Sequence, residues 1–154
     1  MGGVFQNNRI QEADFVVQLA KALEIPNNTV YARRILCSIF QTLRVRITPI
    51  ASSAIIAHLS KDVKQMYMGG WDNRYLPMFD YDDFINALYK QKGLEHLTLF
   101  NSKQHAERSV AAIFEVMKVQ LTDNQYNSMM SLMPVLLRLN LMKDYVFEGH
   151  SYFS

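Results

Sequence analysis

Residues Ala32–Thr48 read ARRILCSIFQTLRVRIT, and a related stretch, Ala106–Thr122, reads AERSVAAIFEVMKVQLT. Ala32 corresponds to Ala106, which lies 74 residues later (106 − 32 = 74). This offset is too long for a solenoid repeat but suits two copies of one helical unit. The identical pairs at this offset include Arg34/Arg108, Ile39/Ile113, Phe40/Phe114, Val45/Val119 and Thr48/Thr122.

The first copy has the apolar periodicity of an amphipathic helix. An earlier helix is indicated by apolar residues at helical spacing within 15–23, and it should end before Pro26. Thr48 followed by Pro49 supplies a capping residue and a proline at the first helical position, so a third helix should begin there. The expected inward-facing stripe of the central helix comprises Ala32, Ile35, Leu36, Ile39, Phe40, Leu43 and Ile47.

A second unit of the same kind is expected after Gly69-Gly70, because paired glycines end a helix. Asp80 should cap its first helix, in which apolar residues at 84, 85 and 88 repeat the pattern at 15, 16 and 19. We therefore predict one all-α domain over residues 1–154, a bundle of two tandem three-helix repeats related by an approximate twofold axis. Unit one spans about 9–70, unit two spans about 80–142, and an aromatic tail, 143–154, is expected to pack onto something.

The last helix of the second unit contains Pro134. Proline removes one backbone hydrogen bond and clashes with the preceding turn, so a break or kink belongs near Met133. Pro134 aligns with Ser60, itself a suitable N-cap, and we predict that both third helices bend or restart at this point. Thr122 with Gln125 has the spacing of a capping box at the start of the later helix.

Composition predicts a soluble cytoplasmic protein with a substantial core. Apolar residues make up 49% of the chain, and sixteen Lys and Arg face fourteen Asp and Glu. The basic residues are scattered, whereas a nucleic-acid-binding protein concentrates them on one face. The single cysteine excludes an internal disulfide and a cysteine-rich metal site. No apolar run reaches the length of a membrane span.

A family resemblance is carried by residues between positions 32 and 71. The matching residues are Ala32, Phe40, Leu43, Arg44, Arg46, Ile47, Thr48, Ala57, His58, Leu59, Val63, Tyr67, Gly70 and Trp71. Met133-Pro134 and Leu137-Arg138 repeat part of the pattern. In these residues the chain resembles a bacterial family of proteins of unknown function, DUF2267. Ser60 departs from the pattern, in which proline is usual. The resemblance implies an all-helical fold and implies no activity.

The residues capable of chemistry form no recognisable site. The spacing of His58, His96, His105 and His150 does not suggest a ligand set, and Cys37 aligns with Ala111, which favours a space-filling role. Asp80, Asp82 and Asp83 are explained by the start of a helix, where carboxylates are favourable. No glycine-rich phosphate loop is present. We therefore predict no catalytic residue, no cofactor and no metal.

The Arg34/Arg108 pair leaves two interpretations open. The sequence favours a salt bridge between the units or an arginine stem lying on the core. The alternative is an anion-binding site on the pseudo-twofold axis.

Two groups of residues suggest an interaction surface. The sequence favours a Trp71 that packs the two units together, and the alternative is an interface anchor, because Trp and Tyr dominate binding hot spots. Met suits irregular cores and also adaptable surfaces. The last helix is also apolar nearly all round, which is more than a single core buries. The expected interaction surface comprises Tyr67, Trp71, Tyr75, Met129, Met130 and Met133.

The leading functional hypothesis is a non-enzymatic helical module that binds a protein partner or forms a homodimer. The runner-up is a binder of a small apolar or amphipathic ligand in a cleft between the two repeats. An enzyme ranks third, and nucleic-acid binding ranks fourth.

Overall fold

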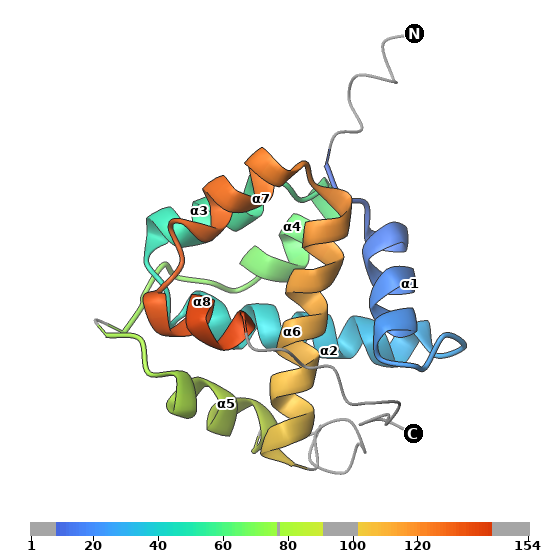
Figure 1. The fold of residues 1–154 in the computed structure, drawn as a ribbon, viewed down its shortest axis with the longest axis horizontal. Coiled ribbons are helices and arrows are strands. Elements are labelled where there is room, and N and C mark those ends of the chain that lie inside the picture. Colours follow the sequence, from blue (N-terminus) through green and yellow to red (C-terminus); the bar gives the residue numbers. More distant parts are fainter. Residues whose placement is uncertain (1–8, 77, 91–101, 143–154) are drawn as a thin grey trace, which may run out of the picture.

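The computed structural model describes residues 9–76, 78–90 and 102–142, and these ranges form helices without a strand (Figure 1). The only regular backbone pairing among them outside the helices is an isolated bridge between Ile10 and Leu59. The all-α expectation is therefore confirmed. The helices are α1 (Glu12–Ala22), α2 (Thr29–Arg44), α3 (Pro49–Ile56), α4 (Lys61–Met68), α5 (Tyr81–Tyr89), α6 (Lys103–Gln120), α7 (Asp123–Met130) and α8 (Val135–Leu141).

The two longest helices, α2 and α6, cross near the middle of the molecule and organise the packing (Figure 1). Helix α1 contacts both α2 and α6, and α5 contacts both of them as well. Helix α4 packs on α2, and α3 lies against α7. The tail at 143–154, which is expected to pack onto the rest of the protein, lies outside the described residues.

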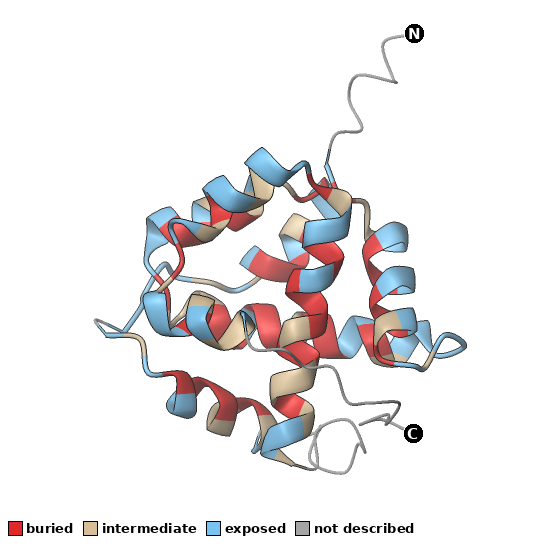
Figure 2. Ribbon diagram, in the orientation of Figure 1, coloured by how far each residue is buried: buried red, intermediate tan, exposed pale blue. Residues whose placement is uncertain are grey.

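The predicted apolar stripe of α2 faces the core (Figure 2). Every one of its residues, from Ala32 to Ile47, is at most 2% exposed. The corresponding stripe along α6, from Ala106 to Leu121, is at most 7% exposed. Burial of each large aliphatic side chain contributes roughly 1.5–3 kcal/mol, so these two stripes provide much of the driving force for folding.

The N-termini of α3, α5 and α7 are capped as the sequence predicts, whereas Ser60 precedes α4 without a side-chain capping hydrogen bond. Thr122 Oγ1 accepts a hydrogen bond from the backbone N–H of Gln125 (3.1 Å), whose side chain accepts one from the Thr122 N–H (2.9 Å). This is the expected capping box. Thr48 caps α3 through the N–H of Ala51, and Asp80 caps α5 through the N–H of Asp83.

Both of the expected third helices are interrupted. The first ends at Ile56 and restarts at Lys61, and the second ends at Met130 and restarts at Val135. The predicted break near Met133 and Ser60 is therefore confirmed, because Pro134 and Ser60 each stand immediately before the new helix. Four helices rather than three lie on either side of the central loop in the described residues.

Arg44, at the C-terminal end of α2, holds the end of α4. Its guanidinium donates hydrogen bonds to the backbone carbonyls of Tyr67 (2.8 Å) and Gly69 (2.7 Å). These carbonyls belong to the last turn of a helix, where a positive charge is favourable. The contact fixes the point at which the chain leaves α4 and enters the loop that begins at Trp71.

Candidate functional site

The expected aromatic part of the interaction surface is divided between core and surface. Tyr67 is fully buried, and its hydroxyl shares a 2.6 Å hydrogen bond with Ser52. Burial raises the pKa of Tyr67, so its phenol stays neutral. Trp71 is half-buried with its ring edge-on to Tyr67, at 5.9 Å between centroids. Tyr75 alone of the three is exposed. Tyr67, which the sequence places on the interaction surface, is therefore a core residue instead.

The methionines belong mainly to the core. Met129 and Met133 are at most 3% exposed, and Met130 is half-buried against the same core. Their flexible thioethers fill the space around the short helices α7 and α8. None of the three offers a fully exposed contact.

Five of the exposed apolar residues lie on the outer face of α8 and the turns at its ends. Leu137 faces inward and is fully buried, whereas its neighbour Leu136 is 50% exposed. Val135, Leu136, Leu139 and Met142 follow one another at helical spacing, so they form one stripe, and Leu132, in the turn before α8, is counted with it. We call this stripe the α8 surface, and it comprises Leu132, Val135, Leu136, Leu139 and Met142.

A small cavity opens beside the α8 surface. Its volume is about 210 Å³, and it lies between the end of α2, the loop before α5 and the turn from α7 to α8. We call it the α7–α8 pocket. It brings together Tyr75 and Met133, two predicted site residues that are far apart in the sequence. Its lining is Arg46, Ile47, Thr48, Tyr75, Leu76, Phe79, Leu132, Met133 and Pro134.

The charged groups near the pocket are matched with one another. Arg46 Nε donates a hydrogen bond to Asp83 Oδ2 (3.0 Å), and a second guanidinium nitrogen donates to the Thr42 carbonyl (2.9 Å). On the loop, Arg74 Nε donates to Asp72 Oδ2 (2.7 Å). Because these charges are already paired, the pocket presents mainly apolar side chains. It is therefore suited to an apolar group.

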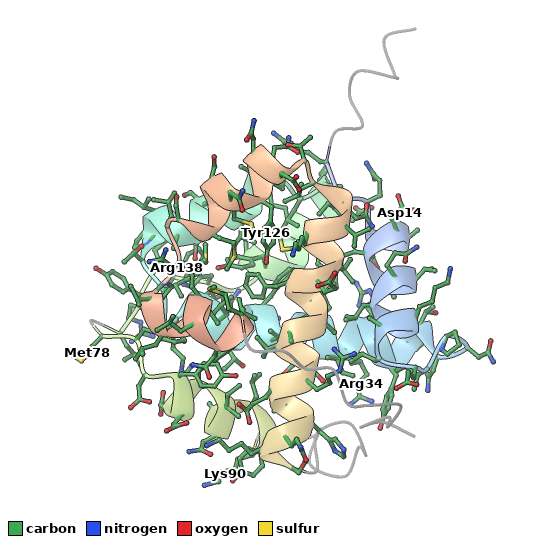
Figure 3. The ribbon with its side chains drawn as sticks, in the orientation of Figure 1. Asp14, Arg34, Met78, Lys90, Tyr126 and Arg138 are labelled. Carbon is green, nitrogen blue, oxygen red and sulfur yellow. The ribbon has the colours of Figure 1, made fainter. Side chains whose placement is uncertain are left out.

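The same edge of the molecule carries a further exposed side chain. Met78, in the loop before α5, is 81% exposed and projects outward (Figure 3). Arg138 of α8, which Figure 3 also labels, has a buried Nε that finds no hydrogen-bond partner among the described residues.

The acidic cluster at the start of α5 has structural partners. Asp80 Oδ1 accepts from the N–H of Asp83 (3.1 Å), and Asp82 accepts from Lys103 Nζ (3.1 Å). Asp83 is the partner of Arg46. Each carboxylate therefore stabilises the helix start or joins two elements, as the sequence suggests.

The remaining reactive side chains are dispersed. Cys37 is half-buried on α2, and burial raises the pKa of its thiol, with Arg33 opposing the shift. His58 is half-buried, and burial lowers its pKa. In the ranges that the structure describes, no three His, Cys, Asp or Glu side chains gather as metal ligands. His96 and His150 lie outside those ranges.

Arg34 and Arg108 sit on α2 and α6, and both take part in polar or charged interactions.

A family model matches residues 12–139, from the first residue of α1 into α8. Its description is "Uncharacterized conserved protein (DUF2267)". The chain belongs to this family. The DUF2267 match includes both central helices, the α7–α8 pocket and most of the α8 surface. No protein among the curated sequences matches the chain.

Among the described helices, none combines the length and the hydropathy that crossing a lipid bilayer requires.

Proposed function

We propose that this DUF2267 protein is a non-enzymatic interaction module of the cytoplasm that binds protein through the α8 surface. The observation that carries the proposal is the exposure of five apolar side chains along α8 and the turn before it, each between 48% and 79%. A helix that packs only against its own core leaves polar residues outward. Here both faces are apolar, so the outer one is suited to a partner.

The size of the α8 surface supports this proposal. Five side chains exposed to this extent present on the order of 500 Å² of apolar surface. The largest apolar patch on a typical soluble monomer measures about 300–600 Å², and patches of that size often bind. Exposed Tyr75 and Leu76 at the adjoining pocket extend the patch toward the roughly 800 Å² that each partner buries in a standard interface.

We infer further that the two halves of the domain are copies of one unit. Two observations support this. Helix α1 contacts α2 and α6, and its counterpart α5 contacts α6 and α2, as an approximate twofold axis requires. The first residues of three helix pairs also lie 74 positions apart, namely Thr29 and Lys103, Pro49 and Asp123, and Lys61 and Val135.

The partner we propose first is a second copy of the chain. An isologous dimer places the same patch on both subunits, and an apolar stripe without charges is complementary to itself. The runner-up, a small apolar ligand between the halves, has less support. The α7–α8 pocket, at about 210 Å³, is smaller than the roughly 300–1,000 Å³ of most ligand sites.

Sedimentation of the purified protein across micromolar to millimolar concentrations tests the proposal. We expect a dimer that the double variant Leu136→Lys/Leu139→Lys converts to a monomer. Val119→Lys is the matched control, because Val119 is 71% exposed on α6, away from the α8 surface. A wild-type monomer throughout, or a dimer that is unaffected by the double variant, would refute self-association through α8.

A further inference from the structure

The turn between α3 and α4 and the turn between α7 and α8 have the same backbone geometry. The residue after each first helix is αR, with φ −58° and ψ −23° at Ala57 and φ −62° and ψ −20° at Ser131. Ser60 and Pro134, which precede the next helices, are both extended. Two backbone N–H groups in each turn donate to carbonyls three residues earlier: His58 to Ile55 and Leu59 to Ile56, and Leu132 to Met129 and Met133 to Met130.

The first of these turns is occupied by an extended residue of the same chain. The N–H of Ile10 donates to the His58 carbonyl (2.8 Å), and the N–H of Ser60 donates to the Ile10 carbonyl (2.9 Å). The Ile10 side chain is 3% exposed. Ile10 stands immediately before Gln11, the N-cap of α1. The turn therefore accepts one extended residue through two backbone bonds and one buried apolar side chain.

The second turn has a cavity at the equivalent place. The residue immediately before the N-cap of α5 is Phe79, which lines the α7–α8 pocket together with Leu132 and Pro134. The Phe79 ring lies against the Phe84 ring, at 6.0 Å between centroids. Among the described residues, no backbone N–H is bonded to the Leu132 carbonyl, which corresponds to the occupied carbonyl of the first turn.

Pro134 explains part of this difference. Ser60 contributes an N–H to the bridge with Ile10, and proline has none. The second turn can therefore offer only one backbone bond, through the Leu132 carbonyl. The pocket beside it adds space for an apolar side chain. Ile10 supplies the first turn with a backbone N–H donor and an apolar side chain. In the second turn, the Leu132 carbonyl and the apolar cavity are suited to receive the same two groups.

From this geometry we propose that the α7–α8 pocket is a docking slot for an extended peptide segment of a protein partner. The segment inserts one Ile- or Leu-sized side chain and donates its backbone N–H to the Leu132 carbonyl. This mode resembles strand addition, in which a peptide binds an exposed sheet edge through backbone hydrogen bonds, but here only one residue takes part. The inference rests on the proposed function and names the chemistry of the partner. Leu132 belongs to both the pocket and the α8 surface, so one partner can occupy both.

The probe is a blocked synthetic peptide with the sequence of residues 6–13, QNNRIQEA, which carries the isoleucine that fills the first turn. Titration into isotope-labelled protein should shift the amide signals of Leu132, Met133 and Val135 in a saturable manner. Changing the isoleucine to aspartate should abolish the shifts. Methylating the isoleucine nitrogen should weaken binding about tenfold, because the backbone donor is lost.

A protein variant tests the same contact through a gain of affinity. Pro134→Ser restores the N–H that Ser60 provides in the first turn, and it should bind the peptide about threefold to tenfold more tightly. Ser60 occupies the equivalent backbone conformation, so the variant is expected to fold, and its circular dichroism spectrum checks this. Ser131→Ala is the control, because Ser131 is exposed and leaves every slot contact in place.

Three results would overturn the inference. Saturating peptide without shifts at the turn would exclude this site. Equal affinity of the methylated peptide would mean that the cavity takes any apolar group, including a small ligand. Shifts of the same amides on concentration alone, if they persist in the Leu136→Lys/Leu139→Lys variant, would assign the slot to a second copy of the chain. The sedimentation test is separate, because Leu136 and Leu139 lie outside the pocket lining, so failure of the slot and failure of the α8 dimer are distinguishable.

Discussion

Two neighbouring leucines on α8 allow a direct test of which face of this helix is buried. Leu137 is fully buried, whereas Leu136 is 50% exposed. Truncation of a buried leucine to alanine costs about 2–5 kcal/mol, because apolar contacts are lost and a cavity remains. Truncation at a half-exposed position removes less buried area and costs at most about 1 kcal/mol. Leu137→Ala should therefore be the much more damaging change.

Thermal and urea denaturation of the two variants, at one low protein concentration, measure the difference. In a protein of this size 1 kcal/mol corresponds to about 2–4 °C in the melting temperature. Leu137→Ala should therefore lower the melting temperature by roughly 5–15 °C, and Leu136→Ala by no more than about 4 °C. Equal losses would mean that α8 is rotated from the orientation described, and the α8 surface would not exist as an exposed stripe.

Three further predictions concern the framework around the site. Tyr67→Phe should lower the free energy of unfolding by about 1–3 kcal/mol, because the buried Ser52 hydroxyl loses its partner, and Ser52→Ala in the same chain should recover part of the loss in a thermal double-mutant cycle. Thr122→Ala should cost about 1 kcal/mol by urea denaturation through loss of the capping box. Burial lowers the pKa of folded His58, so the unfolded state binds the proton more strongly and stability should decline as pH falls below about 6.5. His58→Gln should make the urea midpoint less dependent on pH in that range.

The central helices could be predicted from sequence because their patterns are long. The stripe from Ala32 to Ile47 extends over several turns, so its period identifies the buried face without ambiguity. Thr122 and Pro134 act locally, through a hydroxyl that caps and a missing N–H, and such effects do not depend on the rest of the fold. These features appear in the structure where the sequence places them.

The short helices could not be oriented in the same way. Helix α4 restarts at Lys61, so the direction in which Tyr67 points cannot be extrapolated from α3 across the turn. Helix α8 is apolar on both faces, and periodicity therefore does not distinguish Leu136 from Leu137. Packing against the rest of the domain makes that choice, which is why the exposed residues of α8 replace the methionines as the candidate surface.

The α7–α8 pocket could not be predicted from the sequence, and the reason is a different one. Its walls come from the end of α2, the loop before α5 and the turn at Leu132, which are distant in the chain. One available signal was the alignment of Pro134 with Ser60. This alignment identified the turns between α3 and α4 and between α7 and α8. It did not indicate that Ile10 bridges the first of them or that the second stays open.

The exchange of contacts between the halves has a consequence for how the chain folds. Helix α1 of the first half packs on α6 of the second half, and α2 of the first half packs on α5 of the second half. Each half therefore covers apolar side chains of the other half. A fragment that ended in the central loop would expose the surfaces that α5 and α6 cover. Closing contacts between such distant segments carries an entropic cost and slows folding relative to a bundle of sequential helices. We therefore expect the domain to fold late and in one cooperative step, with little native packing before the second half of the chain is available.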